Sequence, residues 1–293
     1  MPGRGSNLPA LVIHGGAGRK LALVLREERV RESLHRIVTE TFHRLRTQSA
    51  LDCVVWAVTQ LEDDPQFNAG TGGALQRDGV ARLTAGISDG ESRKCSGVIN
   101  VEKVKNPILV ARALLKEQDR VLCAEGARKY ARTRKFGAYN PATEKTLKEW
   151  RSSVEGRHFT SEERFGTVGA VAVDRRGHVA AATSTGGKGM EVVGRVSDSA
   201  TVAGNYASRK AAVSTTGVGE EIVEAALAAR IVTRVDDGRT LTAAFQKTFR
   251  ELRAMKGRGA AIGVDWHGHV AVDATTQCVL HAIHTPKRIE IYP

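Results

Sequence analysis

The sequence predicts an α/β protein in which helices flank a sandwich of β-sheets. Up to about residue 165, short apolar runs alternate with segments of helical period, and beyond it strand-like segments enclose a pair of helices. Two segments of the second half, 173–180 and 264–271, share the pattern V-D-x-x-G-H-V-A, which is typical of similar hairpins. The 293 residues, 41% of them hydrophobic, are enough to bury one large core or two small ones.

Helical periods dominate the first half. Residues 25–46 carry apolar side chains at helical spacing, Ser49 can cap a helix that starts at Ala50, and Pro107 suits a first helical turn. The expected elements are a buried strand at 10–13, a glycine-rich loop at 14–18, hairpin-like segments at 73–76 and 80–87, a strand at 95–101, and helices at 25–46, 50–61, 107–116, 124–133 and 145–151, the last with the weakest period.

The second half begins after a polar segment without clear period, which predicts a flexible tail at about 150–166. The elements expected beyond it are strands at 168–173 and 178–182 around a turn at 174–177, helices at 220–232 and 241–255, the hairpin at 263–271, and strands at 278–283 and 288–291.

Thr167 stands at the first position of the strand that follows this segment. A threonine hydroxyl is a poor nucleophile unless a base is adjacent. Cleavage before Thr167 would create that base, since the new α-amine lies on the same residue and titrates near ~8. An isolated Gly-Thr pair more often marks an ordinary strand start, so the rest of the chain must decide.

The charge balance is basic throughout, with a formal net charge of +12. Residues 1–166 carry 28 basic and 20 acidic side chains and residues 167–293 carry 16 and 12, so no single tail holds the excess. The densest basic patch comprises Lys129, Arg132, Arg134 and Lys135. No aromatic-interleaved or zinc-knuckle motif accompanies it, and a solvated basic face is favoured over a nucleic-acid surface.

The sequence contains no strong signal for a membrane span, for secretion or for a metal site. No apolar run approaches the ~20 residues of a membrane span, and the N-terminus has no apolar segment typical of a secretory signal. The four cysteines form no C-x-x-C pair, as expected of reduced thiols in a cytoplasmic protein. The histidine pairs 267/269 and 281/284 lack the converging ligands of a zinc site, and packing roles are favoured for them.

Six motifs occur in a fixed order along the chain: LVIHGGAG at 11–18, FNAG at 67–70, GTVGAVA at 166–172, AATSTGG at 181–187, GRVSDS at 194–199 and TG at 216–217. Together they resemble the plant-type L-asparaginase/isoaspartyl peptidase family of N-terminal-nucleophile hydrolases, over nearly the whole chain. The resemblance implies a four-layer αββα sandwich formed by a single domain, 1–293. It also implies self-cleavage between Gly166 and Thr167 into chains 1–166 and 167–293.

The resemblance also assigns roles. Thr167 matches the nucleophile, and Thr185 matches a threonine that hydrogen-bonds it. The other matched positions are Arg195 for the substrate α-carboxylate, Asp198 for its α-ammonium, Thr216 and Gly217 for the oxyanion hole, and Asn68 in the lining. Without the other motifs, Arg195 and Asp198 could form a surface ion pair, and 183–185 a plain strand end.

One loop matches a segment that binds a structural sodium ion through backbone carbonyls, a donor type that suits a hard cation. The carbonyls expected to contribute are those of Leu61, Glu62, Asp64, Phe67, Ala69 and Thr71. No cofactor is expected for catalysis. The resemblance also suggests a homo-oligomer, a dimer of αβ units.

The sequence departs from the family pattern near the substrate groups. Ser197 replaces a glycine, and residues 188–193 keep the usual length without the usual residues. The motif set contains no second clamp for the leaving group, so ammonia and peptide amines are both expected to leave.

The expected activity is hydrolysis of the side-chain amide of asparagine or of β-aspartyl dipeptides, through a covalent β-aspartyl ester on Thr167. A secreted glycoasparaginase is a related alternative, disfavoured by the absence of a signal peptide. An alternative from another class is a basic nucleic-acid-associated protein on an inactive hydrolase scaffold.

Overall fold

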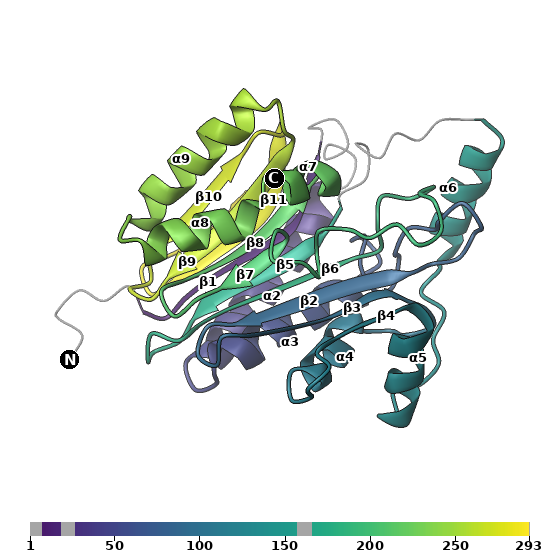
Figure 1. Cartoon of the computed structure of the whole chain (residues 1–293), viewed down its shortest axis with the longest axis horizontal. Coiled ribbons are helices and arrows are strands. Elements are labelled where there is room, and N and C mark those ends of the chain that lie inside the picture. Colours follow the sequence, from purple (N-terminus) through teal and green to yellow (C-terminus); the bar gives the residue numbers. More distant parts are fainter. Residues whose placement is uncertain (1–7, 19–26, 157–165, 293) are drawn as a thin grey trace.

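Two β-sheets packed face to face form the centre of the protein, and helices cover both outer faces (Figure 1). The structure is a computed structural model that describes residues 8–18, 27–156 and 166–292. The order of layers is therefore α-β-β-α, and the expected four-layer sandwich is confirmed.

The larger sheet has the strand order β12-β11-β1-β5-β6-β2-β3-β4 within the described residues. Its strands are β1 (Ala10–Gly18), β2 (Leu83–Asp89), β3 (Lys94–Val101), β4 (Val121–Cys123), β5 (Val168–Val173), β6 (Val179–Thr185), β11 (Cys278–Thr285) and β12 (Arg288–Tyr292). The smaller sheet has the order β10-β9-β8-β7. It contains β7 (Asn205–Ala207), β8 (Ala211–Gly217), β9 (Gly259–Asp265) and β10 (Val270–Ala274).

The outer layers differ in size. The larger sheet is covered by α2 (Glu27–Leu45), α3 (Ala50–Asp63), α4 (Pro107–Leu114) and α5 (Ala124–Thr133). The smaller sheet is covered by α8 (Leu227–Asp236) and α9 (Leu241–Ala254). Two further helices, α6 (Glu144–Val154) and α7 (Gly219–Glu224), lie nearer the ends of the strands (Figure 1).

Successive side chains of the central strands point alternately into two cores, one between the larger sheet and its helices and one between the two sheets. In β5, Val168 and Ala170 pack toward the helices, whereas Val171 and Val173 pack between the sheets. Such a strand is apolar on both faces and gives a continuous apolar run in the sequence. By the same alternation, Thr167 is directed toward the space between the sheets.

The glycine-rich segment 14–18 is part of β1, so its prediction as a loop is wrong. It pairs with β11 on one side, and a bulge between His14 and Gly16 shifts the register. A bulge absorbs one extra residue without ending the strand. His14 also pairs with β5, whereas Gly16, Ala17 and Gly18 pair with β11 alone, and this pairing overrides the turn signal of the glycines.

The helix expected at 220–232 is two helices, α7 and α8, which corrects the prediction of a single one. Ala226 breaks it with a φ of 46°, in the left-handed region. The amides of Ala228 and Ala229 then donate to the carbonyls of Ala203 and Val202, each at 3.0 Å. The first turn of α8 is therefore satisfied by the loop before β7 rather than by a preceding helical turn.

The helix α6 extends to Val154, so the expected tail does not begin at 150. Thr143 and Thr146 form a reciprocal capping box that starts the helix. Trp150 anchors it by donating from Nε1 to the carbonyl of Arg77 at 3.4 Å. The rest of the expected tail, 157–165, lies outside the described residues.

Candidate active site

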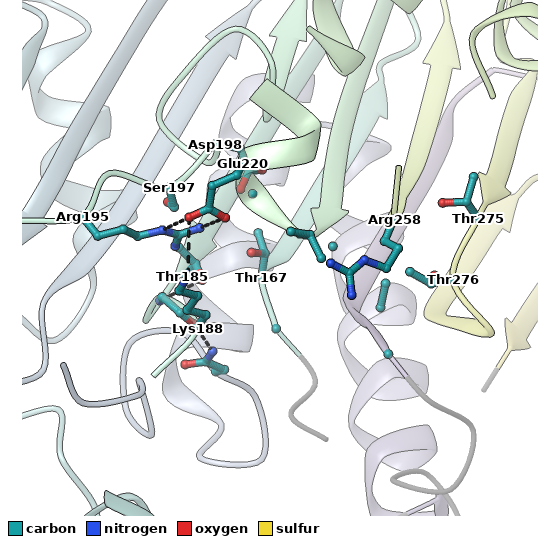
Figure 2. Close-up of a pocket in the computed structure, with 18 of the residues that line it drawn as sticks. Thr167, Thr185, Lys188, Arg195, Ser197, Asp198, Glu220, Arg258, Thr275 and Thr276 are labelled. Carbon is teal, nitrogen blue, oxygen red and sulfur yellow. Dashed lines mark hydrogen bonds and ion pairs between the residues drawn. The ribbon is translucent and has the colours of Figure 1, made fainter. Parts of the chain in front are cut away.

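A cavity of about 440 Å³ lies at the start of β5, where Thr167 is part of its lining (Figure 2). Its lining includes, among others, the predicted site residues Asn68, Gly166, Thr167, Thr185, Arg195, Asp198 and Gly217. These residues come from distant parts of the chain, and the structure gathers them at one place.

Thr167 and Thr185 lie at the same end of neighbouring antiparallel strands. Val168 pairs with Ser184, so the next position places Thr167 opposite Thr185. Both side chains are almost fully buried, at 7% and 2% exposed. The hydroxyl of Thr185 accepts the amide of Gly187 at 3.1 Å, which fixes the chain just beyond β6.

Thr216 faces the proposed cleavage site from the opposite sheet. A Cβ added to Gly166 would lie 4.0 Å from its Oγ1. That oxygen is buried and has no hydrogen-bond partner among the described residues. A buried hydroxyl without a partner costs about 1–3 kcal/mol, so it is an unusual feature of a strand end.

Gly217 follows with a φ of 141°. A Cβ there would lie 2.6 Å from the carbonyl oxygen of Arg258, so only glycine allows β8 and β9 to approach this closely.

Arg195 and Asp198 converge on one point above Gly219. A Cβ added to Gly219 would lie 2.6 Å from Nη2 of Arg195 and 2.9 Å from Oδ1 of Asp198. A glycine at this position therefore leaves open the space between a cation and an anion. The arrangement can hold a group that carries a carboxylate and an ammonium on neighbouring atoms.

Arg195 is held in place by a carboxylate. Its Nε and Nη2 donate to the two oxygens of Glu220, each at 3.0 Å, and Lys188 lies 3.6 Å from the same group. The bond from Arg195 is the main cause that lowers the pKa of Glu220 to about 2. Glu220 thus stays charged and orients the guanidinium.

Asp198 has a different environment. Burial raises its pKa to about 6, against the opposing effects of Arg195 and of a hydrogen bond from Thr215 Oγ1 at 3.3 Å. A carboxylate of this kind gains when a cation enters the cavity beside it.

Asn68 lines the cavity, but both ends of its amide are occupied. Nδ2 donates to the carbonyl of Gly187 at 2.6 Å, and Oδ1 accepts the amide of Ala74 at 2.8 Å. The side chain joins the loop after α3 to the end of β6. Ser197, the departure from the family pattern, also lines the cavity, and its buried hydroxyl has no partner among the described residues.

Three buried polar side chains form a chain of contacts that joins β1, β8 and β6. His14 Nε2 lies 2.8 Å from Ser214 Oγ, which lies 2.7 Å from Thr183 Oγ1. Burial lowers the pKa of His14 to about 3, so its ring is neutral at ordinary pH. A Cβ on Gly169 would lie 2.1 Å from Ser214 Oγ, so the lack of a side chain at Gly169 leaves room for the Ser214 hydroxyl between the sheets.

The loop expected to bind sodium is closed on itself. The carbonyl of Glu62 accepts the amide of Thr71 at 2.8 Å. A Cβ on Gly72, whose φ is 93°, would lie 3.0 Å and 3.2 Å from the carbonyl oxygens of Pro65 and Phe67. The carbonyl oxygens of Pro65 and Phe67 therefore lie close to Gly72, and carbonyl oxygens are donors that suit a hard cation.

The densest basic patch is engaged within the protein. Arg132 donates to the carbonyls of Lys103, Phe136 and Gly137. Arg134 pairs with Glu117 and lies over the ring of Tyr130. These contacts do not favour a nucleic-acid surface there.

The histidine pairs have packing contacts. His281 stacks on Tyr292 with ring centroids 4.5 Å apart, and His284 stacks on Phe42 at 3.7 Å. His269 Nδ1 lies 2.8 Å from Asp265 Oδ2. Within the described ranges, no three or more His, Cys, Asp or Glu side chains form a group that could hold a metal ion.

No helix in the part of the chain that the structure describes is long and apolar enough to cross a membrane. All four cysteines are free thiols: Cys53, Cys95, Cys123 and Cys278.

Three charged residues of the cavity had not been predicted: Lys188, Glu220 and Arg258. For Glu220 a signal existed, because an acidic residue directly follows Thr216–Gly219 at the start of a predicted helix. Arg258 stands between two glycines, and only the fold brings it near Thr167.

Comparison with known proteins agrees with this architecture. Residues 7–292 match the family described as asparaginase. An isoaspartyl peptidase/L-asparaginase of Synechocystis sp. is 44% identical, with 94% of this chain and 88% of that protein covered. An isoaspartyl peptidase of Escherichia coli is 36% identical, covering 93% and 91%, and a plant-type L-asparaginase of Pyrococcus abyssi is 40% identical, covering 75% and 77%.

The sandwich and the family match define a hydrolase of the N-terminal-nucleophile class. The chain belongs to the asparaginase family.

Proposed function

We propose that the protein is a self-processing threonine amidohydrolase. It cleaves its own chain between Gly166 and Thr167 and then hydrolyses the side-chain amide of asparagine or of β-aspartyl dipeptides. The observation that carries the proposal is the convergence of Thr167 with the Arg195–Asp198 pair on one cavity. Next to Gly166 of its lining lies the buried Thr216 hydroxyl, which has no partner among the described residues. The names of the relatives at 36–44% identity support the substrate class.

In the mature enzyme the α-amine of Thr167 accepts the proton of its own hydroxyl as Oγ attacks the side-chain carbonyl. The Thr216 hydroxyl and the Gly217 amide stabilise the resulting oxyanion. The leaving amine takes the proton, and a β-aspartyl ester remains on Oγ. Water, deprotonated by the same α-amine, then attacks the ester and releases aspartate.

The two charged groups above Gly219 bind the aspartyl unit. Arg195 binds its α-carboxylate, with Glu220 fixing the guanidinium, and Asp198 binds its α-ammonium. Thr185 and Asn68 position the nucleophile and the loop after β6. Holding the substrate and the nucleophile in this geometry raises the reaction rate, because the entropy cost of orienting them is met on binding.

Measuring aspartate released by matured protein from asparagine and from β-aspartyl-leucine tests the proposal. A related glycoasparaginase would instead require a glycosylated asparagine. If neither simple substrate yields aspartate while a glycosylated one does, the proposed substrate class is wrong.

The pH dependence of kcat/KM should show the titration of Asp198. Its pKa of about 6 means that it becomes protonated, and loses its attraction for the α-ammonium, as pH falls through that value. The α-amine of Thr167 must also be neutral, with a pKa near ~8. The slope of log kcat/KM against pH should therefore steepen from about 1 to about 2 below pH ~6.

Succinamic acid, which lacks the α-ammonium, provides the control for this profile. It should be a poor substrate and should show no steepening. If succinamic acid were cleaved as well as asparagine, the role of Asp198 would be wrong.

We also propose that the loop from Leu61 to Thr71 binds a structural sodium ion, which the closeness of the Pro65 and Phe67 carbonyls to Gly72 supports. An ion that binds only the folded protein stabilises it. The melting temperature should be about 2–5 °C higher in sodium chloride than in choline chloride of equal ionic strength. Equal melting temperatures would contradict a sodium site.

The proposed setting is cytoplasmic, which four free thiols support. The proposed assembly is a dimer of αβ units. In the segment 192–202, Val192, Val193, Val196 and Val202 are each at least half exposed, and exposed apolar side chains support an interface. Light scattering on matured protein tests the mass of the assembly.

A further inference from the structure

The cavity continues past Thr167 to a second arginine. Figure 2 shows Thr167 between Arg195 on one side and Arg258 on the other. Thr275 and Thr276 lie on the same side of Thr167 as Arg258 (Figure 2), and both line the cavity, as does Gln277. The site therefore offers a cation on each side of the nucleophile.

Arg258 is fixed beside the proposed oxyanion hole. Its carbonyl accepts the amide of Val218 at 2.9 Å and lies close against Gly217. Its Nε and Nη2 donate to Glu221 at 3.2 Å and 2.7 Å. The backbone and side chain of Arg258 are thus held by the start of α7, the helix that also carries Glu220.

The possible substrates differ on this far side. The scissile amide of asparagine ends in NH₂, whereas that of a β-aspartyl dipeptide continues into a residue with its own carboxylate. That carboxylate carbon is two bonds from the scissile nitrogen and so stays within about 4 Å of the amide. A dipeptide with its α-carboxylate at Arg195 directs this second carboxylate away from Arg195.

We propose that Arg258 binds the carboxylate of the leaving group, so that the mature enzyme selects β-aspartyl dipeptides with a free C-terminus. The proposal rests on the proposed function and names its substrate class. It replaces the expectation that the site has no second clamp for the leaving group. Planar guanidinium groups suit carboxylates, and a half-exposed one still adds a charge-assisted hydrogen bond.

The test compares β-aspartyl-leucine with β-aspartyl-leucinamide, which differ only in the terminal carboxylate. We expect wild-type kcat/KM to be about tenfold higher for the acid than for the amide at low salt, as for one partly exposed charged contact. The ratio should fall as ionic strength rises. Because both rates are measured on one preparation, the ratio is independent of the fraction of matured enzyme.

Arg258→Gln should bring the acid-to-amide ratio to about 1. Arg253→Gln is the matched control, because Arg253 is equally exposed, pairs with Asp273, and is absent from the cavity lining. That variant should keep the wild-type ratio. If Arg258→Gln does not mature, Arg258→Lys and the salt dependence of the wild-type ratio test the same contact.

A wild-type ratio near 1 would overturn the assignment, and so would a ratio that collapses in Lys188→Gln but persists in Arg258→Gln. Either result, obtained while aspartate is still released, leaves the proposed function standing. Absence of aspartate release from asparagine and from both dipeptides would overturn the proposed function and this assignment together.

Discussion

Replacement of Thr167 by alanine is expected to abolish both chain cleavage and turnover. The substitution removes the hydroxyl that attacks in each reaction, while the small side chain leaves the buried strand start intact. Loss of a nucleophile costs at least about 10⁴-fold in rate. Denaturing electrophoresis and aspartate release from β-aspartyl-leucine measure the two effects on one sample.

Thr167→Ser is the matched control, because it keeps the hydroxyl and removes one methyl group. It should still cleave itself and turn over substrate, at reduced rates, since β-branching no longer restricts χ1. If the alanine variant were cleaved, or if it hydrolysed substrate at an appreciable rate, Thr167 would not be the nucleophile.

Arg195→Ala should reduce kcat/KM by about 100-fold or more, mainly through a higher KM. The substrate α-carboxylate would lose charge-assisted hydrogen bonds worth about 1.5–3 kcal/mol each. Glu220 would also lose its bidentate partner and would repel the incoming carboxylate. Steady-state kinetics on matured variant protein measure this effect.

Arg234→Ala separates binding from the general loss of an arginine–carboxylate pair. Arg234 is 16% exposed and Arg195 is 14% exposed, and Arg234 binds Glu251 at 2.8 Å and 2.7 Å. The control should lower the melting temperature and leave KM near the wild-type value. An unchanged KM in Arg195→Ala would remove Arg195 from the binding site.

Elements with a strong local signal could be predicted from the sequence. The helix at 124–133 has the bounds that its period predicts, and Ser49 caps α3 by accepting the amide of Asp52. The strand β5 follows its apolar run because both of its faces are buried. In each case local and tertiary preferences agree.

Other elements depend on pairing that a local reading does not contain. Residues 14–18 resemble a loop but form a strand that pairs with β11, and among them only His14 also pairs with β5. The strand β8 (Ala211–Gly217) is small and polar, since Ser214 and Thr216 face the other sheet. Residues 14–18 contain no branched apolar side chain and β8 contains only Val213, so neither has the apolar run by which strands are usually found.

The residues of the site also divide into those with a local sequence signal and those that only long-range packing places there. Four residues that the ordered motifs singled out, Thr167, Thr185, Arg195 and Asp198, line one cavity. Glu220 lies on α7 and Arg258 directly precedes β9, and no motif in the sequence joined these two residues to the site. Long-range packing determines such positions, so a single sequence predicts them poorly.

The intact mass of purified protein under denaturing conditions tests the central claim most directly. The account predicts two fragments, 1–166 and 167–293, with Thr167 as the new N-terminus, and substrate turnover that appears in step with them. A chain that stays whole and still hydrolyses asparagine or β-aspartyl-leucine would contradict it, because Thr167 would then have no α-amine to act as its base.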